Sequence, residues 1–427
     1  MKVCILCTYY DPCLVGGAEI SARLLAENLA ANGIEVHVLT PNYSSGQDEV
    51  EAGKVIIHRF KSISRSLDKK KEASHSIYNR SRAFSLLLLN QYVKYLSWKF
   101  RREFEKLNRE HRFDIVHANN FENALALKHI SAGIPKVAHI RDLTLFCLNK
   151  HTSGGVFCSH CTVPGLAKCL STSRFMAFLI RWDIISRRTR NIGRIDHYIA
   201  ISTFMKEGLL LEKIPKRRIS VIFNPVGSEA VAKLSRADAR KKLGLKYRRI
   251  CIYVGALNSY KGAHIIPAVA KMLPEVDFIV VGDGPLRHLF DGPSGSSGNV
   301  HYLGKRPASE VSCLYRAADA LLVPATAHQG FGRIIMEGQM NAIPVIATDV
   351  AGVREVIRDN ETGILVPHNS PKAMAQAIRR LLADKTLQER IARRSEEFAR
   401  GAYSEKAFAS KVVALYNRLS GSGIGPD

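Results

Sequence analysis

The residues with the clearest capacity for chemistry lie in the segment 329–337, Gln-Gly-Phe-Gly-Arg-Ile-Ile-Met-Glu. The segment follows an apolar run at 320–324 and opens a helical pattern that carries Glu337. Backbone amides at the start of a helix attract an anion, and the Glu337 carboxylate could accept hydrogen bonds from vicinal hydroxyls such as those of a ribose. The alternative is that Glu337 is an ordinary exposed helical carboxylate. The candidate anion contacts are Gly330, Phe331, Gly332 and Arg333.

Three further loops have glycines where an apolar run meets a helical pattern. Gly16 and Gly17 precede a helix expected at 17–31, and Lys261 follows the apolar run 250–255. Glycines there let backbone N–H groups approach a phosphate, and Lys261 has the reach to bind a diphosphate. The alternatives are tight turns that need glycine for their conformation, and a solvated surface lysine. The third loop supplies Gly282 and Gly284.

The elements that must position these loops form two series of short apolar runs that alternate with helical patterns. This alternation predicts βαβ units, parallel sheets and the α/β class, with two doubly wound domains. Ligands of such sheets bind outside the carboxyl ends of the strands, where the glycine loops stand. The strands expected in the first series are 2–7, 35–40, 55–60, 114–117, 136–140, 198–202 and 219–223. Those expected in the second are 250–255, 278–282, 300–303, 320–324, 345–348 and 364–366.

The boundary between the two series is expected at 224–228, where Asn-Pro and Gly-Ser favour a turn. A chain of 427 residues suits two domains of roughly 200 residues each. We therefore predict a first domain at 1–225, with a cysteine-rich insertion at about 143–170, and a second at 226–404. A C-terminal helix and tail, 405–427, is predicted to return towards the first domain.

The chain is strongly basic, since 62 lysines and arginines against 38 acidic residues give a net charge of +24. Such a charge favours an anionic partner: nucleic acid, anionic lipid or a polyphosphate-bearing substrate. No nucleic-acid-binding motif is recognisable, so nucleic acid is not expected. No apolar run approaches the ~20 residues of a membrane-spanning helix, and the first residues do not form a secretion signal. With nine cysteines, an odd number, the sequence predicts reduced thiols in the cytoplasm.

These motifs occur together in an ordered set. In that order the chain resembles the family-four retaining glycosyltransferases (glycosyl transferases group 1) over nearly its whole length. The resemblance implies the GT-B fold, in which two Rossmann-like domains face a central cleft. The matching segments are 16–19, 224–226, 261–262, 281–285, 329–332 with Glu337, 341–348, Gly352 with Glu355, and 362–363.

The resemblance implies a role for each matching residue. Lys261 binds the diphosphate of a nucleotide-sugar donor and stabilises charge on the departing nucleotide. Glu337 holds the ribose, and the loop 330–332 contacts the donor sugar through its backbone. Gly16 and Gly17 approach the diphosphate and the sugar from the first domain. The implied donor-binding set is Gly16, Gly17, Ala256, Lys261, Gly282, Gly284, Gly330, Phe331, Gly332, Arg333 and Glu337.

Two positions depart from the family pattern. Gln329 stands where the family commonly has the first glutamate of a Glu-x7-Glu pair, and Ala256 stands where it usually has an arginine. Gln329 can hydrogen-bond sugar hydroxyls but carries no charge, and Lys261, Arg333 or helix dipoles must compensate for the missing cation. Two hypotheses follow. One is a hexosyltransferase acting on a saccharide or lipid-linked acceptor, as in polysaccharide or glycolipid synthesis. The other is a catalytically weakened nucleotide-sugar-binding protein on the same scaffold.

The first domain is expected to supply a polar residue near the reacting sugar. Family members often have a histidine at the end of a strand, a place that either His139 or Arg141 takes here, followed by Asp142. The alternative for His139 is a packed core residue. The catalytic candidates are Lys261, Gln329, Glu337 and His139. No Asp-x-Asp at a strand end is available to chelate a divalent cation with a diphosphate, so a metal-independent reaction without a cofactor is expected.

A local cysteine cluster offers a different chemistry. Ten, two and seven residues separate its successive members, and such spacing fits a tetrahedral thiolate site for a structural zinc ion. The alternative is four reduced thiols in a loop. The members are Cys147, Cys158, Cys161 and Cys169.

Two basic segments, 67–112 and 175–194, interleave aromatic side chains with lysines and arginines. Amphipathic basic helices of this kind are typical of elements that lie on an anionic membrane surface. An equal alternative is helices with core-facing aromatics and solvated basic faces. Since both segments lie in the acceptor-side half, they predict a lipid-linked acceptor and peripheral association with the inner face of the cell membrane.

Overall fold

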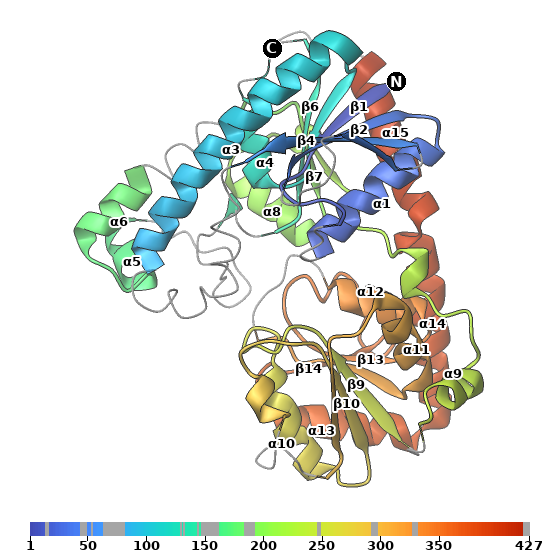
Figure 1. The fold of residues 1–427 in the computed structure, drawn as a ribbon. Coiled ribbons are helices and arrows are strands. Elements are labelled where there is room, and N and C mark those ends of the chain that lie inside the picture. Colours follow the sequence, from blue (N-terminus) through green and yellow to red (C-terminus); the bar gives the residue numbers. More distant parts are fainter. Residues whose placement is uncertain are drawn as a thin grey trace. The chain divides into compact units, whose positions relative to one another are not determined.

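The computed structural model describes residues 1–12, 17–42, 49–52, 54–62, 82–128, 130, 133–142, 145–146, 162–182, 193–245, 249–291, 298–326 and 332–421. The chain forms two compact units, Met1–Ile222 together with Ala409–Asp427, and Phe223–Phe408. Each unit contains one sheet with its own helices (Figure 1). The predicted class, α/β with two doubly wound domains, is confirmed.

The sheet of the first unit has eight strands in the order β3-β4-β2-β1-β5-β6-β7-β8. Neighbouring strands run parallel, except for the antiparallel pair β3 and β4. Successive residues of the central strand, from Val3 to Leu6, are fully buried, so both faces of the sheet are covered. The strands are β1 Lys2–Leu6, β2 Glu35–Asn42, β3 Glu49–Ala52, β4 Val55–Lys61, β5 Ile115–Ala118, β6 Lys136–Ile140, β7 His197–Ala200 and β8 Ile219–Val221.

Amphipathic helices cover this sheet. In α1, for example, Ala22, Leu25 and Leu29 recur at helical spacing and are buried. Helix α15 (Glu405–Gly421) ends in this unit, where the Tyr416 hydroxyl lies 2.6 Å from Nδ1 of His117 on β5. The other helices are α1 Gly17–Ala31, α3 Arg82–His111, α4 Phe121–Leu127, α5 Val163–Cys169, α6 Arg174–Ile180 and α8 Thr203–Leu211, with a 3-10 turn, η3, at Lys216–Arg218.

The second unit has a six-stranded parallel sheet in the order β11-β10-β9-β12-β13-β14. Its strands are β9 Ile250–Val254, β10 Asp277–Val281, β11 Val300–Gly304, β12 Ala320–Val323, β13 Val345–Thr348 and β14 Ile364–Val366. Its helices are α9 Arg236–Lys242, α10 Ile266–Met272, α11 Ala308–Ala317, α12 Arg333–Met340, α13 Pro371–Ala383 and α14 Lys385–Tyr403. The 3-10 turns are η4 Ser228–Ala230, η5 Ala263–Ile265 and η6 Arg287–Leu289.

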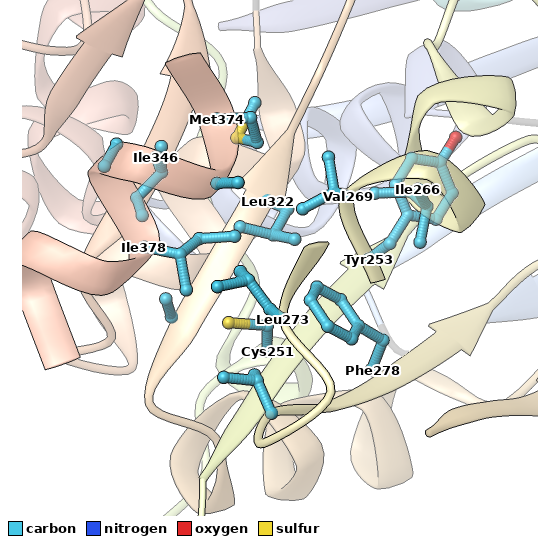
Figure 2. Packing of buried hydrophobic residues seen from close by; sticks show 14 of the residues in the cluster. Cys251, Tyr253, Ile266, Val269, Leu273, Phe278, Leu322, Ile346, Met374 and Ile378 are labelled. Atoms are coloured by element: carbon cyan, nitrogen blue, oxygen red, sulfur yellow. The ribbon is translucent and has the colours of Figure 1, made fainter. Parts of the chain in front are cut away.

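Successive residues of each strand in this sheet belong alternately to two hydrophobic cores, because side chains along a strand point to opposite faces in turn. Cys251 and Tyr253 belong to the core under α10 and α13, whereas Ile250 and Ile252 belong to the core under α11 and α12. Figure 2 shows the first of these cores, with its sheet residues packed against apolar side chains of the two helices. The labelled residues are Cys251, Tyr253, Ile266, Val269, Leu273, Phe278, Leu322, Ile346, Met374 and Ile378.

Several expected elements coincide with the observed ones residue for residue, namely α1, β6, β13 and β14. The strand expected at 198–202 instead runs from His197 to Ala200, because Ser202 caps α8: its side chain accepts a hydrogen bond from the Met205 amide. The short edge strand β3 was not expected from the sequence. Within the described residues, no helix combines the length and the apolar character needed to cross a bilayer.

Candidate active site

The carboxyl edge of the second unit's sheet carries three of the glycine loops. Strand β9 lies between β10 and β12, and the chain order reverses there, which is where open parallel sheets bind ligands. The loops that follow these three strands are therefore neighbours. They are 255–262 after β9, 282–285 after β10 and 324–332 after β12, of which 327–331 lie outside the described residues.

Glycines in these loops allow the backbones to touch. Gly262 has φ +71°, and a Cβ atom added to it would lie 1.7 Å from the carbonyl oxygen of Pro324. Gly282 has φ +138°, and its added Cβ would lie 1.9 Å from the carbonyl oxygen of Gly255. Both positions exclude any side chain, so the loops pack to a spacing that only glycine permits. The donor contacts predicted for Gly282 and Gly284 stay predictions.

Lys261 lies in a loop that is fastened to the loop after β12. The Thr326 hydroxyl donates to the Ser259 carbonyl over 2.7 Å, and the Lys261 amide donates to Oδ1 of Asn258 over 2.9 Å. Burial lowers the pKa of the Lys261 ammonium. An ammonium group in a desolvated position is stabilised by an anion, so this lysine is suited to hold a diphosphate.

Glu337 is largely buried, which excludes the alternative that it is an ordinary exposed helical carboxylate. Its side chain is 15% exposed, and its Oε1 accepts a hydrogen bond of 2.7 Å from Nε of Arg333, one turn earlier on α12. The hydroxyl of Tyr315 on α11 lies 3.4 Å from Oε2. Burial, and after it the Glu337 charge, raises the pKa of Tyr315 well above its usual value. The carboxylate is thus held in one orientation, with lone pairs left for a further donor.

The first turn of α12 begins at Gly332, whose carbonyl accepts from the Ile335 amide at 2.9 Å. Arg333 is engaged with Glu337, so it orients the carboxylate as well as adding positive charge. Ala256 supplies a carbonyl that accepts from the Tyr253 hydroxyl at 2.9 Å. Of the predicted donor-binding and catalytic residues, four lie outside the described residues: Gly16, Gln329, Gly330 and Phe331.

The sheet of the first unit has its own switch point, between β1 and β5. Arg141, which follows β6, is buried and donates from Nε to Oδ1 of Asn119 over 2.6 Å. Asn119 follows β5, and its Nδ2 lies 3.4 Å from the carbonyl of Ala18 in α1. The Thr8 hydroxyl donates to Oδ1 of Asn123 over 2.8 Å. Sequence analysis missed Thr8, Asn119 and Asn123, although Thr8 directly follows the strand expected at 2–7 and Asn119 lies two residues after the one expected at 114–117.

His139 occupies a different environment from Arg141. It is fully buried within β6, with its ring 5.5 Å from that of His117, and burial lowers its pKa well below the usual value. Arg141 lies just past the end of β6, and Asp142, next in sequence, is half-buried. Of the two candidates for the strand-end position, Arg141 is therefore the one at the switch point, and His139 has the surroundings of a core residue.

The cysteine cluster falls mostly outside the described part of the chain. Cys147, Cys158 and Cys161 are not among the described residues, and the predicted zinc site stays a prediction. Cys169 is the last residue of α5 and is exposed.

Two family models match the chain. The model for Glycosyltransferase Family 4 matches residues 15–229, and the model for Glycosyl transferases group 1 matches residues 235–398. The first alone spans just over half of the 427 residues, so the chain belongs to Glycosyltransferase Family 4. The resemblance noted in the sequence is confirmed at the level of the family.

Curated relatives match over different lengths. The D-inositol 3-phosphate glycosyltransferase of Corynebacterium glutamicum is 33% identical over 194 residues, which are 42% of this chain and 46% of that protein. The chain thus spans about half the length of the first curated relatives it matches. The phosphatidyl-myo-inositol mannosyltransferase of Mycobacterium leprae is 24% identical over 432 residues, covering 99% of this chain and 98% of that protein.

Solved structures share the whole fold. Sucrose-phosphate synthase from Thermosynechococcus elongatus matches with a TM-score of 0.74 at 20% identity, over 98% of both chains. HepE from Anabaena, in complex with UDP-glucose, matches with a TM-score of 0.65 at 18% identity, over 98% of this chain and 100% of that chain. The GT-B fold implied by the sequence resemblance is confirmed.

Proposed function

We propose that this protein transfers a sugar from a nucleotide-diphosphate sugar to a saccharide or lipid-linked acceptor, with retention of configuration and without a catalytic metal ion. The observation that carries the proposal is the loop of Lys261, fastened beside the segment that leads into α12 at the switch point of the second unit's sheet. Family membership supports the reaction class. The UDP-glucose in the HepE complex supports the donor class.

In this proposal the donor's phosphate–sugar bond breaks and the nucleoside diphosphate departs with added negative charge. The Lys261 ammonium and the amides at the start of α12 stabilise that charge. Glu337, held by Arg333 and Tyr315, accepts hydrogen bonds from the ribose. The acceptor oxygen bonds to the anomeric carbon on the face from which the diphosphate leaves, and its proton passes to the departing phosphate.

Lysine and helix amides supply the positive charge that a divalent cation supplies in other nucleotide-sugar enzymes. The sequence has no Asp-x-Asp pair at a strand end to hold such a cation. Donor turnover that persists in EDTA is therefore the expected result. Loss of turnover in EDTA, with recovery on adding Mg²⁺ or Mn²⁺, would show that a metal ion takes part.

A face of α6 supports a membrane-bound acceptor. Phe175 and Phe178 of α6 and Trp182, two residues past its end, recur at helical spacing. Their exposed fractions are 68%, 50% and 65%, and the exposed cations Arg174 and Arg181 accompany them. The opposite side of α6 packs on α5 through a small apolar core, Leu166, Leu170, Ala177 and Ile180. Aromatic side chains among arginines are suited to an anionic lipid surface. The full-length relative named for a phosphatidyl-inositol acceptor points the same way.

Vesicle binding tests this face. We expect the protein to sediment with vesicles of phosphatidylcholine and phosphatidylglycerol, and the double variant Phe175→Ser/Phe178→Ser to lose most of that binding. Leu211→Ser is the matched control, since Leu211 is 65% exposed in the same unit but lies on α8. Equal binding by all three proteins would exclude α6 as the contact.

The decisive experiment measures donor hydrolysis and transfer with UDP-, GDP-, ADP- and dTDP-sugars in EDTA. D-inositol 3-phosphate and phosphatidylinositol serve as acceptors, because two relatives are named for them. Glu337→Ala is expected to abolish turnover, and Glu361→Ala, an exposed glutamate of the same unit, to leave it unchanged. The anomeric configuration of the product, read by NMR, tests retention. Nucleotide binding without turnover on any donor–acceptor pair would favour the weakened binding protein.

A further inference from the structure

Three histidines in the first unit converge away from the candidate active site. His37 lies near the amino end of β2, His58 lies in β4, and His111 is the last residue of α3. Each offers one ring nitrogen, and these three atoms all lie within 4.8 Å of one another. The carboxyl ends of the strands carry the candidate site, so this cluster belongs to another part of the sheet.

The sheet register brings the first two rings together. In the parallel pair β2–β4, His37 is opposite Ile56, two residues before His58, so both histidines point to the same face. Nδ1 of His37 lies 2.8 Å from Nε2 of His58, and the two rings stack with centroids 5.1 Å apart. The ring of His111 completes the group, 4.3 Å from the ring of His37.

A carboxylate fixes the tautomer of the central ring. Oε1 of Glu35 lies 3.1 Å from Nε2 of His37 and 3.0 Å from Nζ of Lys2. Because a carboxylate accepts, His37 carries its proton on Nε2 and turns the lone pair of Nδ1 towards His58. Histidine ligands of metal ions commonly have this carboxylate on their second nitrogen, where it orients the ring and raises its basicity.

The cluster is largely buried. His37 is 0% and His58 8% exposed, and His111 is half-buried. The alternative is a hydrogen-bonded histidine pair packed on Phe113, whose ring lies 5.0 Å from that of His37. In that alternative the ring of His111 also packs on Phe113, at 5.8 Å, and the convergence of three ring nitrogens serves no purpose.

We propose that His37, His58 and His111 form a binding site for a divalent transition-metal ion of the zinc class, with Glu35 as a positioning carboxylate. Three imidazoles leave one tetrahedral position for water. Two ligands of one zinc ion stand roughly 3.3 Å apart at Zn–N bonds of about 2.05 Å, so the pair at 2.8 Å opens slightly on binding. The ion would fasten the end of α3 to β2 and β4, a structural role separate from the transfer reaction.

Cobalt spectroscopy tests the site on the full-length protein after EDTA treatment and desalting. We expect one Co²⁺ with visible d–d bands and no near-ultraviolet thiolate band, displaced by Zn²⁺. The thiolate band identifies any ion that the cysteine cluster takes. His111→Gln and His58→Gln should each weaken this binding by at least about tenfold. His301→Gln is the matched control. His301 is half-buried in the other unit, with its Nε2 2.8 Å from Oδ1 of Asp277, and the variant should bind Co²⁺ as tightly as the wild type.

Either of two results would overturn the proposal. One is that the wild-type protein binds no Co²⁺, or binds Co²⁺ only in a form that shows the thiolate band. The other is wild-type affinity in both histidine variants. The wild-type spectrum decides the matter even where a variant fails to fold, and thermal unfolding with and without Zn²⁺ gives a second measure. Zn²⁺ should raise the unfolding temperature of the wild type and of His301→Gln, and not that of His111→Gln.

Discussion

The two sheets present their switch points in different ways. At the carboxyl edge of the second unit, neighbouring loops touch backbone to backbone: Gly262 faces the Pro324 carbonyl and Gly282 faces that of Gly255. At the corresponding edge of the first unit, side chains make the contacts, with Arg141 on Asn119 and Thr8 on Asn123. The loops at the switch point of the second unit thus approach each other through their backbones, whereas those of the first unit are joined by side-chain hydrogen bonds.

Under the proposed function, this difference follows from what each edge would bind. A diphosphate presents the same chemistry in every nucleotide-sugar, and backbone amides around glycines can bind it without depending on particular side chains. An acceptor differs from enzyme to enzyme, and a side-chain network can be changed one residue at a time. We therefore expect substitutions in the second unit to damage donor use in general, and substitutions in the first unit to affect the transfer step.

The largest effect is expected from Lys261→Ala. Removing the ammonium takes away the charge proposed to stabilise the departing nucleotide, which should lower kcat by about 10²–10³-fold. Lys271→Ala, an exposed lysine on α10, is the matched control and should leave kcat unchanged. Steady-state kinetics with the donor identified from the panel measures both. A loss of less than threefold would remove Lys261 from the mechanism.

Gly262→Ala tests the backbone contact. The methyl group would overlap the Pro324 carbonyl, whereas Gly244, with φ +62° against +71°, has nothing within 4 Å of an added Cβ. Gly244→Ala should cost only the left-handed conformation, about 1–2 kcal/mol. Gly262→Ala should cost a further ~1–3 kcal/mol and weaken nucleotide binding. Urea unfolding followed by circular dichroism compares them, and equal losses would contradict the close contact.

The contrast also explains which elements and loops could be predicted from the sequence. Helix α1 and strands β6, β13 and β14 could be placed residue for residue, because apolar runs and helical periodicity are local signals. The glycine loops and Lys261 could be located because they directly follow such runs. The short edge strand β3 could not, because its four residues, Glu-Val-Glu-Ala, form no continuous apolar run.

Contacts between segments that are distant in the chain could not be predicted from the sequence. Tyr315 lies on α11, a separate helix from that of Glu337, so nothing local shows that the carboxylate is buried. Arg141 meets Asn119, 22 positions earlier, only after β5 and β6 pair. The sequence placed both His139 and Arg141 near one strand end, but His139 lies within β6 and Arg141 just past its end. Side-chain networks of this kind depend on topology, which single residues do not encode.

Arg141→Ala is expected to have a smaller effect than Lys261→Ala and a different kinetic signature. Loss of the guanidinium releases Asn119 at the first unit's switch point, so kcat should fall by about 10–100-fold while the donor dissociation constant stays within about twofold. Arg218→Ala is the control: this arginine donates to the Gly193 carbonyl and precedes β8, away from the carboxyl edge. Equal loss of donor affinity and turnover would place Arg141 in donor binding instead.

The smallest effect concerns acid stability, which we expect to be concentrated in the first unit. Burial lowers the pKa of His117 to about 3 and that of His197 to about 4, against about 6.5 in the unfolded chain. Below pH ~6.5 the unfolded state therefore binds more protons than the native state. The stability that these neutral histidines contribute is complete above that pH, and it is lost as the pH falls towards their folded pKa values.

Variant His197→Gln isolates one histidine's share of this loss. Between pH 7 and pH 5.5 the wild type should lose about 1 kcal/mol more unfolding free energy than the variant, since a pKa of about 4 leaves native His197 uncharged throughout. Trp98 and Trp182, the chain's two tryptophans, both lie in the first unit, so urea unfolding followed by their fluorescence reports on that unit. The carboxylates contribute equally to both proteins and cancel in the comparison. Identical pH dependence of the two would mean that His197 takes up its proton at the same pH in the folded protein as in the unfolded chain, so that burial does not hold it neutral.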